Sequence, residues 1–393
     1  MKLITLNPIR NEKRIAIIDI LRGWALLGVV LMNYTDVYFF LGKPTHPDAF
    51  NNILITIGGI VFESKSWTLL SFLFGYGFAV LINNIESKGI NPVPFFSKRM
   101  FWLLVLAFIN SAVFFGDILK DYAVLGMVLL IFRRSSAKTA FFISIALLLV
   151  NPAVVAYVVS LNINGVALAA PYFPLYQSHN VLEIFKCGLF ATYKFEMLNP
   201  FYSIACHETI LLCFFLGLAA QKIDFFGRLT ENKKYVRRIF WYSFGFTLMM
   251  WAIFIIVPKV VLGEIFKYYT PMFWLILSIM LFTASAICWL YLSGKLERFF
   301  AAMQLYGKMT LTNYIVQNIL AVLIFSGVGL RLGAYGFSYG IYMLVAIAIY
   351  IAQIYFSKWW LTKYFYGPIE WLWRLLSYGK KLAIKRDRIS EAI

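Results

Sequence analysis

Apolar stretches of about 20 residues follow one another along most of the chain, and they restrict the fold more than any other feature. Each is long enough for an α-helix to cross the hydrocarbon core of a bilayer. Hydrophobic residues make up 61% of the 393 positions and charged residues 14%, whereas a soluble domain has about a quarter charged. A transmembrane β-barrel would show short segments of alternating polarity instead. The sequence therefore predicts an all-α, polytopic membrane helix bundle.

We predict about ten membrane-spanning helices in one integral membrane domain, residues 1–393. They centre on 16–34, 64–85, 99–115, 118–133, 137–160, 201–221, 238–257, 271–293, 309–328 and 338–358. Short interfacial helices are expected at 50–62, at 180–195 and in the tryptophan-rich segment 366–381. Three regions fall outside the spans, namely an N-terminal segment 1–14, a long external connection 161–200, and an interfacial helix with a basic tail over 364–393.

The net charge of +18 comes from lysines and arginines in alternate connections. The connection after the sixth predicted span holds six of them, Lys222, Arg228, Lys233, Lys234, Arg237 and Arg238. This is the positive-inside pattern, and it predicts that both termini are cytoplasmic. We expect a multi-pass protein of the bacterial cytoplasmic (inner) membrane, in contact with membrane lipids. The charges are dispersed and accompany no nucleic-acid-reading motif, so no nucleic-acid partner is expected.

Cysteines and histidines give no sign of a metal site. The four cysteines form no CxxC pair, and the three histidines are far apart in sequence. We expect no metal, and we expect the cysteines to be small packing residues. The sequence does not indicate an oligomeric state.

The first apolar stretch, "IDILRGWALLGVVLMNY", carries three polar residues on one helical face. Asp19 and Arg22 are three residues apart, and Asn33 follows about three full turns after Arg22. Such a stripe must face protein or a water-filled cavity, because exposure to lipid is costly. Two interpretations remain open: a structural ion pair near the interface, or the lining of a cavity that binds an anionic ligand or relays a proton.

Further polar residues mark the predicted external half. Asp117 and Asp121 would share a helical face, as loop carboxylates or as part of a cavity. His207 and Glu208 lie about two turns inside the sixth predicted span, and His46 lies in the first external connection. Either histidine is a candidate general base or an ordinary structural residue.

A second polar stripe lies on the ninth predicted span. Thr310, Asn313 and Gln317 recur at intervals of three and four residues, so they share a face. Hydrogen bonding between helices explains this pattern, and cavity lining is the alternative.

Several motifs carry a resemblance to a known family. "DILRGWALLGVVLMN", "FLFGYGF", "GDIL", "GKMTLTNYIVQ" and "GPIEWLWRLLSYG" occur in this order along the chain. They resemble the YeiB-like family of bacterial membrane proteins, which is defined by a domain of unknown function. That family often has a histidine where this chain has Asn110. The D-x-x-R-G opening is also similar to that of heparan-glucosaminide acetyltransferases, in which an asparagine and a histidine serve the reaction; Asn33 matches the asparagine and His46 lies near the histidine.

The resemblance implies a chemistry class but no particular substrate. The leading hypothesis is an acyl-CoA-dependent membrane O- or N-acyltransferase. Acyl-coenzyme A would be the donor from the cytoplasm, held by Arg22 with Asp19 orienting it, and the acceptor would be an extracytoplasmic glycan or lipid-linked sugar. Asn33 would polarise the thioester, and His46 or His207 would take the acceptor's proton. The alternative is a transporter or lipid flippase without covalent chemistry, so whether the chain is an enzyme stays open.

Overall fold

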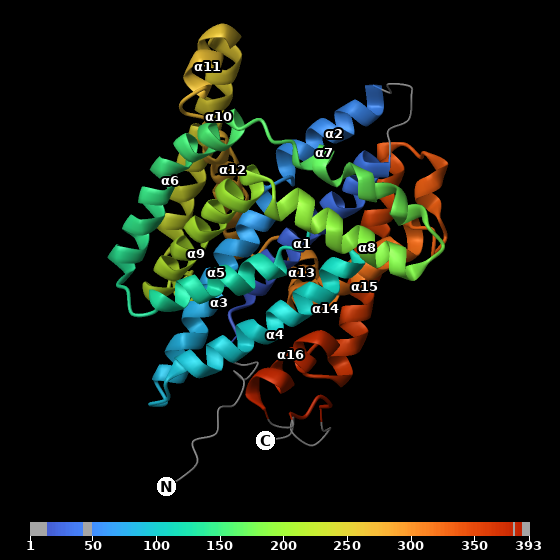
Figure 1. Cartoon of the computed structure of the whole chain (residues 1–393). Coiled ribbons are helices and arrows are strands. Elements are labelled where there is room, and N and C mark those ends of the chain that lie inside the picture. Colours follow the sequence, from blue (N-terminus) through green and yellow to red (C-terminus); the bar gives the residue numbers. More distant parts are fainter. Residues whose placement is uncertain (1–13, 42–48, 380–381, 387–393) are drawn as a thin grey trace.

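The computed structural model describes residues 14–41, 49–379 and 382–386. Over these ranges the chain is built from helices and connections, with one isolated bridge between Tyr364 and Lys385. The predicted all-α bundle is confirmed (Figure 1). His46 lies outside the described residues, as do most of the N-terminal segment and part of the basic tail.

Eight helical segments of the described chain are long and apolar enough to cross a membrane, which makes this a multi-pass membrane protein. They are α1 (Ala16–Leu41), α2 (Ala49–Val61) running into α3 (Lys65–Glu86), α4 (Pro92–Val113), α6 (Ala137–Ser160), η4 (Phe201–Cys206) running into α9 (His207–Lys222), α10 (Lys233–Ile256), α12 (Met272–Leu292) and α15 (Tyr339–Lys363). The shorter ones are α5 (Leu119–Ile131), α7 (Gly165–Ala169), η2 (Ala170–Gln177), α8 (Val181–Thr192), η3 (Tyr193–Met197), α11 (Lys259–Phe266), α13 (Glu297–Lys308), α14 (Thr310–Phe325), η5 (Leu332–Tyr335) and α16 (Pro368–Tyr378).

The ten predicted spans differ from this arrangement at three places. The predicted interfacial helix at 50–62 is α2, which joins α3 in one 38-residue candidate span. The predicted span 118–133 is the 13-residue α5, which at about 1.5 Å per residue is too short to cross a bilayer alone. The predicted span 309–328 is α14, half of a pair with α13 that bends by 82°. Counting the bent pair as one span gives nine.

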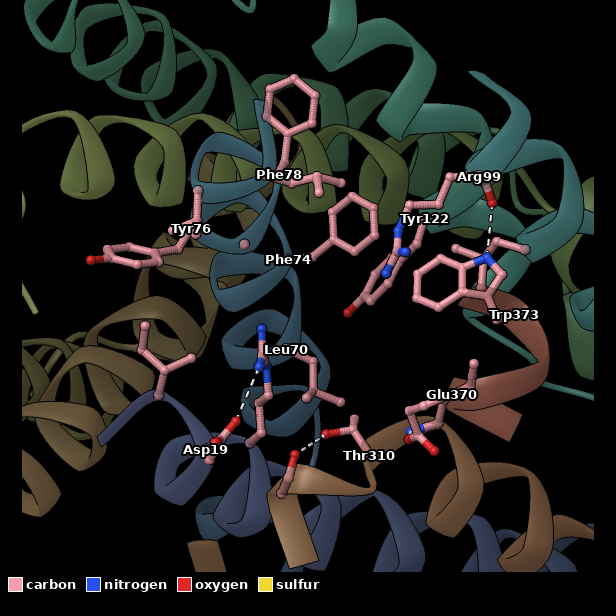
Figure 2. Close-up of a pocket in the computed structure, with 18 of the residues that line it drawn as sticks. Asp19, Leu70, Phe74, Tyr76, Phe78, Arg99, Tyr122, Thr310, Glu370 and Trp373 are labelled. Carbon is pink, nitrogen blue, oxygen red and sulfur yellow. Dashed lines mark hydrogen bonds and ion pairs between the residues drawn. The ribbon is translucent and has the colours of Figure 1, made fainter. Parts of the chain in front are cut away.

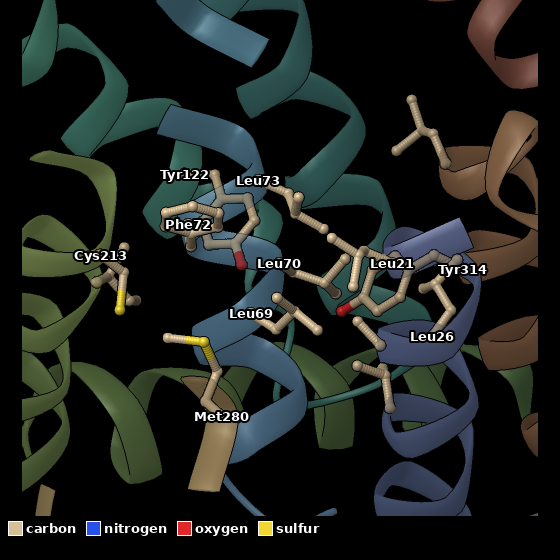
Figure 3. Packing of buried hydrophobic residues seen from close by; sticks show 14 of the residues in the cluster. Leu21, Leu26, Leu69, Leu70, Phe72, Leu73, Tyr122, Cys213, Met280 and Tyr314 are labelled. Carbon is tan, nitrogen blue, oxygen red and sulfur yellow. The ribbon is translucent and has the colours of Figure 1, made fainter. Parts of the chain in front are cut away.

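The core of the bundle forms around α1, which packs against α3, α13, α14 and α15 (Figure 1). Glycines allow the helix backbones to touch. A Cβ on Gly23 of α1 would overlap the carbonyl of Met303 in α13, and one on Gly75 of α3 would overlap that of Phe214 in α9. Leucines of α1 and α3, among them Leu26 and Leu70, fill the space between these helices (Figure 3). Small residues at such contacts are typical of membrane helices, whose association depends on close packing.

Candidate functional site

A cavity of about 360 Å³ opens at the basic end of the bundle. Its walls come from the first half of α1, the middle of α3, the first half of α4, the start of α5, the break between α13 and α14, and α16 (Figure 2). Ligand pockets in proteins usually measure about 300–1,000 Å³. The cavity is therefore large enough to hold the arm of a substrate.

The mouth of the cavity is strongly cationic. The cations that line it are Arg14, Arg22, Arg99, Lys308 and Arg374, against the two acids Asp19 and Glu370. Arg14, Arg99 and Lys308 belong to the basic segments that the charge pattern predicts on one side of the membrane, so we expect the cavity to open on that side. Burial lowers the pKa of Arg374, so an anion at the mouth would stabilise its charged form.

Asp19 and Arg22 lie on the wall of this cavity, where they also form an ion pair. Oδ1 of Asp19 accepts hydrogen bonds from Arg14 at 3.2 Å and from Arg22 at 3.3 Å, while Oδ2 has no hydrogen-bond partner. A Cβ on Gly77 would lie 3.2 Å from Nη2 of Arg22, so this glycine leaves room for the guanidinium. The pair is therefore an ion pair that also lines a cavity (Figure 2), and its binding of an anionic ligand or relay of a proton stays a prediction.

Arg99 is held in place by the C-terminal helix. Its guanidinium lies 3.5 Å from the centre of the Trp373 ring, and the Trp373 indole N–H donates to the Arg99 carbonyl at 2.9 Å (Figure 2). Cation–π contact of this kind fixes the direction of an arginine. Neither residue was predicted to belong to a site; the basic and aromatic "EWLWR" segment suggested only a helix at the interface.

Glu370 of α16 caps the break between α13 and α14. Its Oε1 accepts from the backbone N–H of Leu311 at 2.6 Å and of Thr312 at 3.0 Å, and its Oε2 accepts from the Thr312 hydroxyl at 2.5 Å. A carboxylate at a helix N-terminus satisfies orphan N–H groups and favours the helix dipole. Thr310, at the break, lines the cavity and donates to the carbonyl of Gly307 at 2.6 Å.

Much of the cavity wall is apolar and includes buried tyrosines. Leu26, Leu70 and Leu103 line it, as do Tyr122 and Tyr314 with their neighbours Ile118 and Leu119. Figure 3 shows the Tyr314 side chain close to Leu21 and Leu26 of α1. A cationic mouth followed by an apolar interior suits an amphiphilic anion.

A network of asparagines lies behind Tyr314, the lining residue that we call the floor of the cavity. The Tyr314 hydroxyl donates to Oδ1 of Asp117 at 2.9 Å, and the Asn110 amide donates to the same oxygen at 2.9 Å. The Asn318 amide donates to Asn110 at 3.3 Å, and the Asn33 amide donates to Asn318 at 3.0 Å. Asn33 thus connects to the cavity only through this network and is not one of the lining residues. Asn110 is one of the central members of this network.

An ionic cluster lies beyond the network. The Lys120 ammonium donates to the Asp117 carbonyl at 2.6 Å, pairs with Asp121 at 3.3 Å and contacts Glu196 of η3. His207 Nε2 lies 3.0 Å from Oδ1 of Asp121. Tyr202 donates to Oδ2 of Asp121 at 2.9 Å. Burial raises the pKa of Asp117 to about 6, although Lys120, Tyr314 and Asn110 oppose the rise.

The remaining predicted residues are held apart from the cavity. Glu208 accepts from the Asn151 amide at 2.5 Å. Asn313 donates to Ser357 of α15 and to the Tyr306 carbonyl of α13, both at 3.1 Å, which is hydrogen bonding between helices. Gln317 is fully buried, and its backbone carbonyl accepts from Tyr34 at 2.9 Å. Of the second polar stripe, only Thr310 lines the cavity.

Comparisons with known proteins give relatives without a stated activity. Residues 220–380 match the family model described as "Protein of unknown function (DUF418)". A Bacillus subtilis protein named "Uncharacterized protein YxaH" is 28% identical over 95% of this chain and 96% of its own length. A Bacillus acidopullulyticus protein from the amylase 3' region is 26% identical over 96% and 98%, and "Uncharacterized protein YeiB" of Escherichia coli is 25% identical over 92% and 95%. No solved structure matches the chain.

Proposed function

The chain carries a YeiB-like domain of unknown function within a multi-pass membrane bundle, and from this premise we propose that it is an acyl-CoA-dependent membrane acyltransferase. The donor is acyl-coenzyme A from the cytoplasm, and the acceptor is a glycan or lipid-linked sugar at the opposite face of a bacterial inner membrane. The whole chain works as one membrane domain. One observation carries the proposal: the cavity with a cationic mouth and an apolar interior that ends at Tyr314.

The mouth suits the phosphorylated end of the donor. Arg22 and Arg99 present planar guanidinium groups, which bind phosphate oxygens in pairs and stay charged at all relevant pH values. Asp19 orients Arg22, and the Trp373 ring orients Arg99. The pantetheine arm is long and largely uncharged, so it fits along the apolar wall formed by Leu26, Leu70 and neighbouring residues.

The floor suits the thioester. In acyl transfer the acceptor oxygen bonds to the acyl carbon, the C–S bond breaks, and the thiolate leaves with the electron pair while a protein group takes the acceptor's proton. A hydrogen-bond donor at the carbonyl oxygen stabilises the charge that develops there. Tyr314 lines the cavity and Asn33 does not. The Tyr314 O–H is donated to Asp117, so it would have to turn from Asp117 to the thioester carbonyl to act as this donor; Asn33 acts indirectly by positioning Asn318.

His46 and His207 are the predicted acceptors of the proton, and the structure describes only His207. Both ring nitrogens of His207 already face acceptors, the Ser203 carbonyl at 2.9 Å and Asp121 at 3.0 Å. His207 therefore acts as part of a pair with Asp121 and not as a free base. His46 stays a predicted base outside the described residues.

Binding of acetyl-coenzyme A to the purified protein in lipid nanodiscs tests the proposal. We expect Arg22→Ala and Arg99→Ala each to weaken binding at least tenfold, because each removes a charged phosphate contact worth about 1.5–3 kcal/mol. Arg228→Ala is the matched control, since Arg228 is an exposed arginine that pairs with Asp224 at 3.8 Å and does not line the cavity. Absence of binding by the wild type, or equal binding by all variants, would rule the donor site out.

A proton-coupled transporter is the second candidate, favoured by the polar network that continues from the cavity floor to the ionic cluster. A transporter would move its substrate unchanged. An assay of free coenzyme A thiol distinguishes the transferase from the transporter. The reconstituted protein is given acetyl-coenzyme A and a disaccharide acceptor, and thiol release faster than that of Arg22→Ala supports the transferase.

A further inference from the structure

The ionic cluster beyond the cavity floor contains more acids than bases. Its carboxylates are Asp117, Asp121 and Glu196, and its bases are Lys120 and His207. Asp117 and Glu196 are fully buried, and Asp121 is 3% exposed. Burying unpaired charge costs several kcal/mol, so a site of this kind binds protons in place of carrying its full negative charge.

The His207 ring fixes the position of one proton. Its Nδ1 lies 2.9 Å from the Ser203 carbonyl, which can only accept, so Nδ1 carries a hydrogen. Its Nε2 lies 3.0 Å from Oδ1 of Asp121. Two lone pairs would face each other there unless a proton lies between them. With that proton the His207–Asp121 pair is neutral overall.

The rest of the cluster then holds one ammonium and two carboxylates. Lys120 is shared between Asp121, Glu196 and the Asp117 carbonyl. Asp117 keeps its charge compensated by the donors Tyr314, Asn110 and the Leu119 N–H, at 2.9, 2.9 and 3.3 Å. Glu196 has fewer partners: Lys120 contacts its Oε2, and Oε1, which faces Gly116, has no hydrogen-bond partner among the residues that the structure describes. Glu196 is therefore the carboxyl least able to carry a charge.

We propose that Glu196 is a protonated carboxyl in the resting protein and that the cluster is a proton-binding site which exchanges its proton with the far face through Lys120, Asp121 and His207. Lys120 bridges Glu196 and Asp121, and His207 is the group at the edge, with a side chain 22% exposed. The groups that face the site are Asp117, Lys120, Asp121, Tyr202, Cys206, His207 and, through Asp117, Tyr314.

The electrostatic environment agrees with this assignment. Burial raises the pKa of Glu196, Lys120 opposes the rise, and the negative charges of Asp121 and Asp117 add to it. Burial opposes charge on Lys120, but the neighbouring carboxylates of Asp121 and Asp117 raise its pKa above the ordinary value. The ammonium is thus the fixed charge, and the carboxyl of Glu196 is the group that gains and loses a proton.

Infrared spectroscopy of the full-length protein in nanodiscs tests the proposal without any substrate. The wild type should show, at neutral pH, the C=O stretch of a protonated carboxyl, shifted in D₂O and lost in Glu196→Gln. The band should persist in Glu264→Gln, since Glu264 is exposed and pairs with Lys267. In His207→Phe the shift after transfer to D₂O should be at least tenfold slower, since the exchange path is blocked.

Two outcomes would overturn the inference: absence of the band in the wild type at neutral pH, or its persistence in Glu196→Gln. Thermal melting of Glu196→Gln and His207→Phe shows whether these variants are folded. If Glu196→Gln does not fold, Glu196→Asp tests the site in its place. Its shorter acid should move the carboxyl band without abolishing it. The result does not depend on acyl transfer, so the two proposals fail separately.

Discussion

At the residue scale, Asp19 and Arg22 could be placed from the sequence, and the floor of the cavity could not. A helix turns about 100° per residue, so spacing alone puts Asp19, Arg22 and Asn33 on one face. Spacing says nothing about which distant residues complete the site. Tyr314 lies 295 positions beyond Asp19, and Asn110, Asn318 and Asn33 form one network only because α1, α4 and α14 pack together. An isolated tyrosine or glutamate in an apolar stretch carries no signal of such a contact.

Asp117 gives a pH-dependent prediction. Its pKa rises to about 6 on folding, mainly through burial, whereas an unfolded aspartate titrates near 3.9. Between these values the folded state holds the proton more tightly, so stability should fall as pH rises from about 4 to about 6 and then level off. In Asp117→Asn, the fall in the free energy of unfolding across this pH range should be smaller than in the wild type by about 2–3 kcal/mol. Thermal melting of both proteins across this pH range measures it, and parallel pH profiles would contradict it.

At the element scale, the bent pair α13 and α14 is the main difference from the predicted spans. Met309 has φ −116° and ψ 38°, which leaves the helical region and separates the two helices. Met309 itself is neither proline nor glycine, and Gly307 two residues earlier is only a weak local signal for a break. Its cause is tertiary: Glu370, about 60 residues later, satisfies the N–H groups that the break exposes.

Glu370→Gln should weaken the start of α14. The substitution keeps the side chain's length but removes the charge that favours a helix N-terminus, and we expect a loss of about 1–2 kcal/mol. Hydrogen exchange at Leu311 and Thr312 should become faster, whereas the same amides in Glu264→Gln should exchange as in the wild type. Unchanged exchange in Glu370→Gln would mean that the cap is not needed.

At the scale of the whole molecule, composition and charge predict the architecture well. Apolar length gives a helical membrane bundle, and the alternation of basic connections predicts one basic end. The cations that line the cavity come from the N-terminal segment and from α1, α4, α13 and α16, all on the predicted cytoplasmic side. The charges from which we predict the orientation in a membrane therefore also surround the cavity.

The most direct test of the account is the structure of the protein in nanodiscs with a thioether analogue of acetyl-coenzyme A, which cannot transfer its acyl group. We predict density in the cavity, with the diphosphate near Arg22 and Arg99 and the thioether sulfur within contact distance of Tyr314. Density for a lipid in the cavity with the analogue absent or bound elsewhere would contradict the proposed donor site.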